Sequence, residues 1–221
     1  MSVITISRQV GSGAEEVARL VCERLGYAYF DKNFLVDEAI KTGLSESEIV
    51  ELSEETYKAK TFLENLFSPG ARTVASVAIR RRDETGIEKK YIRHLDELDC
   101  IDMIRTVIEA AYRRGNIVIV GRGGQVILQK KPDVLHVRLI APLEVRIQRI
   151  MGQEGMDADK ARQYIQERDK ATFEYLERFF KVQWDDPTLY NLTINTGEHN
   201  YIGAAATIIH AVEQLGVREA V

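Results

Sequence analysis

A glycine-rich turn near the start of the chain has the residue types and spacing of a phosphate site. Gly11-Ser12-Gly13 follows the short β-branched run at residues 3–6 and precedes a segment with helical spacing of apolar residues. Glycine permits a tight turn because it has no side chain to clash at positive φ. A strand, a glycine turn and a helix in this order direct backbone N–H groups and a helix N-terminus at one point, which favours a bound phosphate.

The turn meets only part of the phosphate-loop pattern G-x-x-x-x-G-K-[ST]. Counting back from Gly13, the first glycine position holds Arg8. The lysine position holds Ala14, and the position of the Mg²⁺-binding hydroxyl holds Glu15. We expect Arg8 to replace the missing positive charge from the opposite lip of the turn. Glu15 has a second explanation, because an acidic residue in a first helical turn favours the macrodipole by ~0.3–1 kcal/mol.

Three further arginines occur where they could hold an anion. Arg122 lies in a second glycine-rich turn, directly after the β-branched run 117–120, and the ends of buried strands carry sites in α/β proteins. It either binds an anion there or caps backbone carbonyls. Arg168 interrupts the apolar stripe of a long predicted helix, where a guanidinium is costly unless it is paired with an acid or a phosphate. Arg149 projects toward the same region if that helix packs on the preceding one.

Two other features have more than one interpretation. Asp31 follows a short strand predicted at 27–30, and it can either cap the next helix or contribute to a site at the strand end. The polar segment 80–90 begins with three adjacent arginines. We interpret this segment as a solvated loop or, alternatively, as a mobile basic loop that closes over an anionic substrate. His136, in the middle of a predicted strand, is interpreted as structural.

The elements that must position these residues alternate along the chain. Long helices are predicted at 95–114 and 156–180, the second with Asp157 near its N-cap, and a last helix at 201–215. Five parallel strands that alternate with helices make a three-layer α/β sandwich. The strands are predicted at 3–6, 27–30, 117–120, 134–140 and 192–195.

The 221-residue chain has the composition of an ordinary soluble domain, with 45% hydrophobic and 29% charged residues, so it can bury a full core. A net charge of −4 argues against binding to a nucleic-acid polymer. Cys22 and Cys100 lie in predicted helices without metal-ligand spacing, which favours reduced thiols. The N-terminus enters a strand without a leader, and no apolar run approaches a membrane span. We therefore expect a cytoplasmic protein without a membrane partner.

Several segments resemble the nucleoside monophosphate kinases, and specifically the cytidylate kinase-like family of P-loop proteins. They are ITISRQVGSGAEEVARLV, YFDK, IVIVGRGGQVIL, VLHVRLIAPLEVRIQRI and WDDPTLYNLTINTG, in the family's order over nearly the whole chain. The resemblance implies a P-loop nucleoside triphosphate hydrolase-like fold with a five-stranded parallel sheet of order 2-3-1-4-5. It also implies one domain over 1–221, with an acceptor-binding helical region at about 31–94 and a lid at about 142–180. ATP would be the phosphoryl donor, with Mg²⁺.

The resemblance also implies roles for individual residues. Arg122 matches an arginine that holds the acceptor's phosphate, with Asp31 nearby. Arg168 matches a lid arginine that stabilises the transferring phosphoryl group, and Arg149 is predicted to add charge to the same reaction. No side chain is predicted as a direct metal ligand. The nucleotide-binding set is predicted to be Arg8, Gly11, Ser12, Gly13, Ala14 and Glu15.

Two classes of function follow. The first is a cytidylate kinase-like phosphotransferase that moves the γ-phosphoryl group of ATP to a nucleoside monophosphate or a similar small acceptor. Phosphoryl transfer depends mostly on positioning and charge stabilisation, which Arg8, Arg122, Arg149 and Arg168 could supply together. The alternative is a catalytically inactive nucleotide-binding or sensor module, in which Glu15 excludes ATP or weakens its binding.

A third possibility is a kinase for a different small acceptor, selected by the arginines at 80–82. The residue after Arg122 bears on this choice. The resemblance places an aspartate there in cytidylate kinases, where it helps to recognise the cytidine nucleotide, but this chain has Gly123. Specificity for cytidine is therefore not supported by the sequence.

Overall fold

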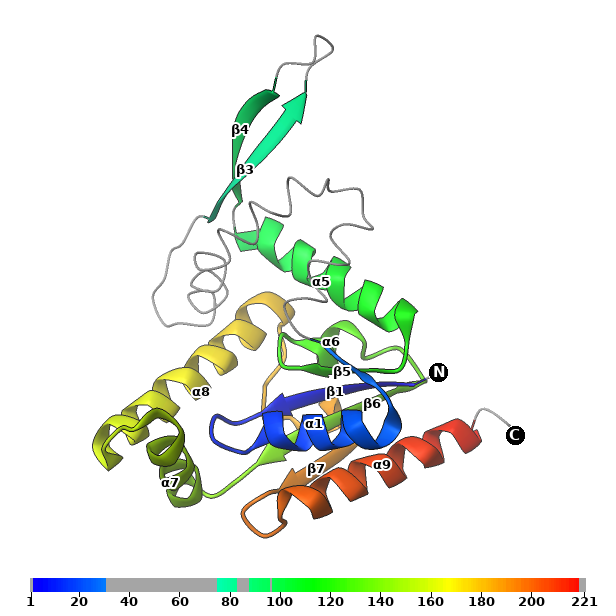
Figure 1. Ribbon diagram of the computed structural model, residues 1–221, viewed down its shortest axis with the longest axis vertical. Helices are drawn as coiled ribbons and strands as arrows, with labels where there is room; N and C mark the ends of the chain where they lie inside the picture. Colours follow the sequence, from blue (N-terminus) through cyan, green and yellow to red (C-terminus); the bar gives the residue numbers. More distant parts are fainter. Residues whose placement is uncertain (1, 31–74, 83–87, 96, 219–221) are drawn as a thin grey trace. The chain divides into compact units, whose positions relative to one another are not determined.

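The computed structural model describes residues 2–30, 75–82, 88–95 and 97–218 (Figure 1). The chain divides into two compact units, Met1–Phe30 with Ile108–Val221, and Asp31–Val107. Asp31 and most of the helical region expected at about 31–94, namely residues 31–74, lie outside the described residues. No helix within the described part is both long enough and apolar enough to cross a membrane.

The first unit contains the predicted five-stranded parallel sheet. Its spatial order is β2-β5-β1-β6-β7, which, counted along the chain among these five strands, is the predicted order 2-3-1-4-5. The order reverses at β1, so the end of β1 is the switch point at which α/β sheets bind ligands. The strands are β1 (Val3–Arg8), β2 (Ala28–Tyr29), β5 (Ile117–Val120), β6 (Val134–Ile140) and β7 (Leu192–Asn195).

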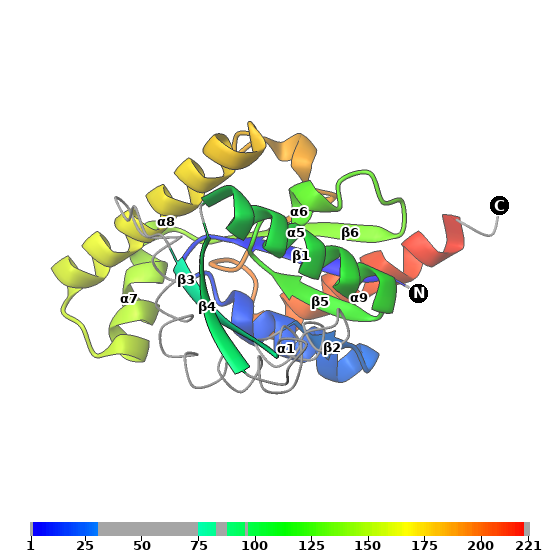
Figure 2. The ribbon, with the colours of Figure 1, turned by 90° about the horizontal axis from the view of Figure 1, so that it is seen from above.

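Helices cover both faces of this sheet and complete three layers (Figures 1 and 2). On one face α1 packs against α9, and on the other α6 packs against β1, on the side where the last turns of α5 also lie. Two paired helices, α7 and α8, lead from β6 to β7. The helices are α1 (Ala14–Leu25), α5 (Glu97–Arg114), α6 (Gly124–Ile127), α7 (Leu143–Glu154), α8 (Ala158–Phe180) and α9 (Tyr201–Arg218), with a 3-10 turn at Pro187–Leu189.

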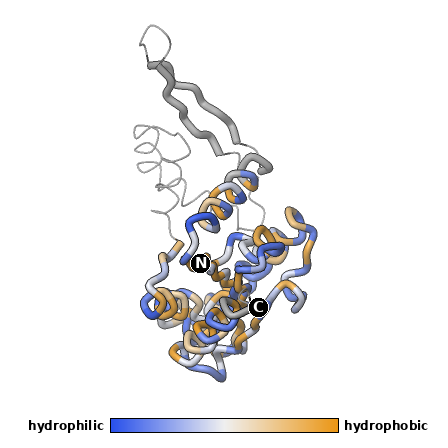
Figure 3. The backbone as a smooth tube through the Cα atoms, turned by 90° about the vertical axis from the view of Figure 1, so that its right-hand side faces the viewer, coloured by the Kyte–Doolittle hydropathy of each residue, from blue (hydrophilic) through white to orange (hydrophobic). Residues whose placement is uncertain are grey.

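The two faces of the sheet differ in polarity. Ile4, Ile6 and Val137 are buried in the apolar core with residues of α1 and α9, and apolar residues concentrate in the middle of the unit (Figure 3). On the opposite face, Thr5 Oγ1 lies 2.7 Å from His136 Nδ1 in a buried contact. Burial lowers the pKa of His136 to about 4, so this side chain is a neutral, structural residue, as predicted.

Two helix ends have the local sequence signals of a helix terminus, and the prediction of Asp157 near an N-cap is confirmed. Gly26 follows α1 with φ +66, and its N–H bonds to Cys22 O. Asp157 caps α8, where its side chain accepts a hydrogen bond from the Lys160 N–H. Trp184 is buried, and its Nε1 donates to Ser7 Oγ at 2.8 Å.

The second unit contains a two-stranded antiparallel sheet formed by β3 (Ala75–Arg82) and β4 (Glu88–Leu95). Its register pairs Ala75 with Leu95 and Arg82 with Glu88. The prediction of a loop over 80–90 is therefore wrong for 80–82 and 88–90. The reason is that an antiparallel ladder is held by backbone hydrogen bonds, so it continues into a segment whose side chains are polar.

Candidate phosphate-binding site

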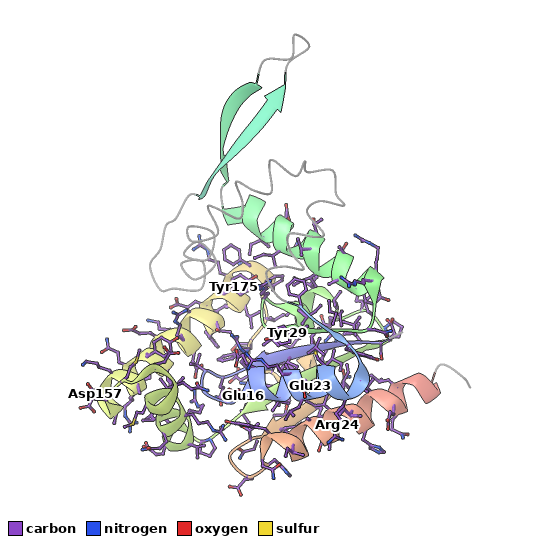
Figure 4. All side chains as sticks on the ribbon, in the orientation of Figure 1. Glu16, Glu23, Arg24, Tyr29, Asp157 and Tyr175 are labelled. Atoms are coloured by element: carbon purple, nitrogen blue, oxygen red, sulfur yellow. The ribbon has the colours of Figure 1, made fainter. Side chains whose placement is uncertain are left out.

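The turn between β1 and α1 has the backbone conformation expected of a phosphate loop. Gly11 and Gly13 both have φ +77, and no side chain caps α1, for which Gly13 is the N-cap. Backbone N–H groups without an acceptor, gathered at a helix N-terminus, form an anion site. Within the described residues, these groups belong to Gly11, Gly13, Ala14, Glu15 and Glu16. Figure 4 shows Glu16 in the first turn of α1, and its Oε1 accepts a hydrogen bond from Gln153 Nε2 of α7 at 3.2 Å.

The carbonyl oxygens of the same loop are bound to protein donors. A ligand at the loop therefore meets N–H groups while the oxygens are occupied, which is the polarity that suits an anion. The pairs are Ser12 N–H with Gln9 O (3.1 Å), Arg146 Nη1 with Val10 O (3.3 Å), Arg149 Nη1 with Gly11 O (3.3 Å), Thr196 Oγ1 with Ser12 O (2.6 Å) and Val17 N–H with Gly13 O (3.1 Å).

Close neighbours, as well as positive φ, require glycine in this loop. A Cβ on Gly11 would lie 2.9 Å from the Arg146 carbonyl oxygen. A Cβ on Gly13 would lie 2.3 Å from Cε1 of Tyr201, the first residue of α9. The sequence indicated both glycines through turn chemistry, but it gave no sign of the side chains that fill the space beside them.

Arg8 lies on the lip of the loop, beside the residue that occupies the hydroxyl position. Its Nε donates to Glu15 Oε1 at 3.2 Å. Its Nη1 lies 3.1 Å from the point where a Cβ on Gly121 would be, so its side chain also reaches the second glycine turn. Two residues of the predicted nucleotide-binding set are thus brought together in an ion pair at the loop.

Arg149, one of the predicted catalytic arginines, bonds directly to the phosphate loop, at Gly11 O. Its Nη1 also donates to Thr196 Oγ1 at 3.1 Å, and its Nη2 donates to Thr196 O at 2.8 Å. The guanidinium lies 5.0 Å from the centre of the Tyr201 ring. These contacts hold the turn after β7 against the phosphate loop.

Arg168 lies on α8, half-buried, with its guanidinium 5.1 Å from the centre of the Tyr164 ring. It has no carboxylate partner within the part of the chain that the structure describes. Stacking of a guanidinium on an aromatic ring leaves its N–H groups directed outward from the ring. Arg168 therefore keeps the capacity to bind an anion.

Arg122 lies in the turn that follows β5. It has a left-handed backbone, with φ +59, and its guanidinium lies 4.9 Å from the centre of the Phe30 ring. The turn is joined to β1 because Gly121 N–H donates to Ile6 O at 2.9 Å. A Cβ on Gly123 would lie 3.0 Å from the Phe180 ring, so an aspartate at that position would require the ring to move.

The ion pair of Arg146 with Asp169 was not predicted from the sequence. Arg146 Nη1 lies 2.6 Å from Asp169 Oδ2, and the two side chains are 8% and 18% exposed. Asp169 Oδ1 also accepts a hydrogen bond from Val10 N–H at 3.0 Å. A signal was present, because Asp169 follows Arg168 in the same gap of the apolar stripe of α8, but the stripe does not identify the partner.

Comparison with known proteins shows that the chain belongs to the cytidylate kinase-like family, which it matches over residues 3–198. Proteins named cytidylate kinase from Methanopyrus kandleri and Methanocaldococcus jannaschii are both 32% identical to it, over 127 and 129 residues. These alignments cover 54% and 57% of this chain, and 65% and 71% of the two relatives. The cytidylate kinase of Archaeoglobus fulgidus is 28% identical over 212 residues, 95% of this chain and 94% of that protein.

A solved structure of an uncharacterized protein from Eubacterium ventriosum has the same fold. It superposes with a TM-score of 0.63 over 96% of this chain and 99% of that chain, at 19% sequence identity. The family match and this superposition agree with the fold class expected from the sequence.

Proposed function

We propose that this protein is a kinase that transfers the γ-phosphoryl group of ATP to a nucleoside monophosphate or a similar small acceptor, in the cytoplasm. The observation that carries the proposal is the loop at residues 9–13, which leaves N–H groups at the switch point of the sheet while its carbonyls are bound elsewhere. Membership of the cytidylate kinase-like family supports the same activity.

On the donor side, the phosphates of ATP would be bound by the N–H groups of Gly11, Gly13, Ala14, Glu15 and Glu16. Arg8 would supply the cation that the lysine provides in the usual phosphate loop, by exchanging Glu15 for a phosphate oxygen. Ser12 is fully buried, and its hydroxyl has no partner among the residues described. Such a group is expected to find a partner in the functional state, and a bound ligand or water would provide it.

Magnesium fits this proposal as an ion held mainly by the nucleotide. Among the described residues, no three His, Cys, Asp or Glu side chains gather as a metal site. Mg²⁺ usually keeps several waters and binds one or two carboxylates together with substrate phosphates. Glu15 is the carboxylate that would hold it here, and the ion would neutralise charge on the phosphates.

On the acceptor side, Arg122 would bind the acceptor's phosphate, with Asp31 as a second proposed contact. Arg168 would stabilise charge on the phosphoryl group in transit, where a positioned guanidinium has its largest effect. Arg149 would act through the loop, because its donors are bound to Gly11 and Thr196. The names of the relatives make CMP the first acceptor to test.

The experiment is an ADP-release assay with Mg·ATP and each of CMP, UMP, AMP, GMP and their deoxy forms, alongside calorimetric titration of Mg·ATP. We expect binding, and turnover with one acceptor that falls sharply in Arg168→Ala and Arg122→Ala. Turnover and binding that are unchanged in both variants would contradict the proposal.

Binding without turnover on any acceptor would instead favour the inactive sensor module. The double variant Ala14→Lys/Glu15→Ser separates the two cases further. In an active enzyme with an altered loop it lowers turnover, because the native residues are arranged differently, whereas in a disabled site it raises turnover.

A further inference from the structure

Val10, Arg146 and Asp169 form a closed ring of contacts that joins the phosphate loop to α7 and α8. Val10 N–H donates to Asp169 Oδ1 at 3.0 Å, and Arg146 Nη1 donates both to Val10 O at 3.3 Å and to Asp169 Oδ2 at 2.6 Å. Arg146 Nε donates to Ala141 O at 3.0 Å, which fixes the guanidinium at the end of β6. The carboxylate of Asp169, on α8, therefore binds both the Val10 N–H of the loop and Arg146 of α7.

A second ion pair between the same helices shows what is special about the first. Arg162 Nη2 of α8 lies 2.8 Å from Glu144 Oε1 of α7, but these side chains are 42% and 73% exposed and bond to no loop residue. An exposed pair of this kind contributes little to stability. A buried pair is weak evidence for stability too, because desolvation opposes the attraction, so burial alone gives no reason for Asp169 to be charged.

We infer that Asp169 is a positioning residue for the phosphoryl transfer proposed above, on which this inference rests. Arg168 precedes Asp169 in α8, so any shift that moves Asp169 away from Val10 also displaces the Arg168 backbone relative to the loop. The Asp169 side chain thereby positions both the loop that would bind the phosphates of ATP and Arg168. Misplacement of reacting groups by about 1 Å can lower a rate by roughly 10²-fold.

The test compares Asp169→Ala and Asp169→Asn with the matched control Glu144→Gln. We expect kcat to fall by about 100-fold in Asp169→Ala. Asp169→Asn should fall less, because its amide oxygen still accepts from Val10 N–H while the charge on Arg146 loses its partner. Glu144→Gln, which removes a charge between the same two helices, should stay within about twofold of wild type. A purely structural role would lower the melting temperature while leaving kcat of the folded protein unchanged, and that result would overturn the inference.

A second readout does not depend on activity. Hydrogen exchange of the amides of residues 9–13 in the free protein should be faster by about tenfold or more in Asp169→Ala, since Val10 N–H loses its acceptor, and unchanged in Glu144→Gln. If wild type shows no turnover, the proposed function fails while this measurement still tests the coupling. If exchange and kcat both match wild type in folded Asp169→Ala, the coupling itself is refuted.

The double variant Arg168→Ala/Asp169→Ala tests whether Asp169 affects kcat through Arg168. If Asp169 acts through Arg168, the loss of kcat in the double variant is smaller than the product of the two single losses. Independent, multiplicative losses would contradict action through Arg168.

Discussion

Two glycine turns of this protein are alike locally and differ in what they offer a ligand. Gly13 begins α1 and Gly123 begins α6, with φ of +77 and +73, and neither helix has a side-chain cap. The strands that lead into them, β1 and β5, are parallel neighbours. Yet α1 has 12 residues whereas α6 has 4.

The difference lies in how each turn satisfies its carbonyl groups. Both turns have backbone bonds of their own: Ser12 N–H donates to Gln9 O in the turn after β1, and Gly124 N–H donates to Gly121 O in the turn after β5, both at 3.1 Å. In the turn after β5, Val126 and Ile127 N–H also donate to Gly123 O, at 2.9 and 3.0 Å. In the turn after β1, side chains of α7 and Thr196 bind three further carbonyls, those of residues 10–12. The turn after β1 is therefore held by side chains of other elements, whereas the carbonyls of Gly121 and Gly123 in the turn after β5 are bound by its own backbone. Two similar glycine turns thus differ because residues far away in the sequence bind the carbonyls of one of them.

A methyl group added to each glycine turn should change stability and nucleotide binding strongly, and more so in the turn after β1. Gly13→Ala should lower the free energy of unfolding by about 2–5 kcal/mol, through left-handed strain and collision with Tyr201, and should abolish Mg·ATP binding. Gly123→Ala should cost about 1–2 kcal/mol, because the Phe180 ring 3.0 Å away can shift. Urea unfolding and calorimetry measure both effects.

Gly26→Ala is the matched control, because Gly26 has φ +66 and nothing within 4 Å of an added Cβ. It should show the backbone strain alone and leave Mg·ATP affinity unchanged. An equal loss of stability in Gly13→Ala and Gly26→Ala would show that contact with Tyr201 has no role in the first turn.

His136, on the face of the sheet that α6 covers, should make the free energy of unfolding depend on pH. The pKa of His136 is lowered to about 4 by burial, against about 6.5 in the unfolded chain, so the unfolded state binds the proton more readily. Its contribution is complete above about pH 6.5 and is lost as the pH falls toward 4, by roughly 3 kcal/mol.

Unfolding measured from pH 7 to 4 in wild type and His136→Gln tests this prediction. The variant should show a shallower decline, whereas a change at the exposed His210 should leave the slope as in wild type. If the free energy of unfolding falls equally with pH in wild type and His136→Gln, the pKa of His136 does not change on unfolding.

Removal of one side-chain donor to the loop should lower stability and Mg·ATP affinity by a smaller amount. Thr196→Val removes the hydroxyl that donates to Ser12 O and accepts from Arg149, and it should cost about 1–2 kcal/mol of stability. Mg·ATP affinity should fall by about 3- to 10-fold as the loop loosens. Thr193→Val, on the exposed side of β7, should leave affinity unchanged. Equal affinities in the two variants would refute a role for Thr196 in shaping the loop.

Local sequence signals predict much of this fold and the backbone of the site, but not the side chains that hold it. The β-branched run 117–120, Gly26 and Asp157 correctly indicate a strand and two helix ends, because each acts within a few residues. Asp169 binds a loop peptide 159 positions away in the sequence, and Thr196 binds one 184 positions away. Periodicity and turn chemistry carry no information about such partners, so the carbonyl contacts appear only in the folded chain.

The proposed function depends on binding of the phosphates of ATP by the N–H groups of the β1–α1 turn. Titration of the isotope-labelled protein with Mg·ATP, followed by amide NMR, measures this binding residue by residue. We expect the largest shifts at Gly11, Gly13, Ala14, Glu15 and Glu16, with small shifts at residues 121–124 until an acceptor is added. Binding with shifts confined to other residues, or unchanged amides at 11–16 at saturating nucleotide, would refute phosphate binding at this turn.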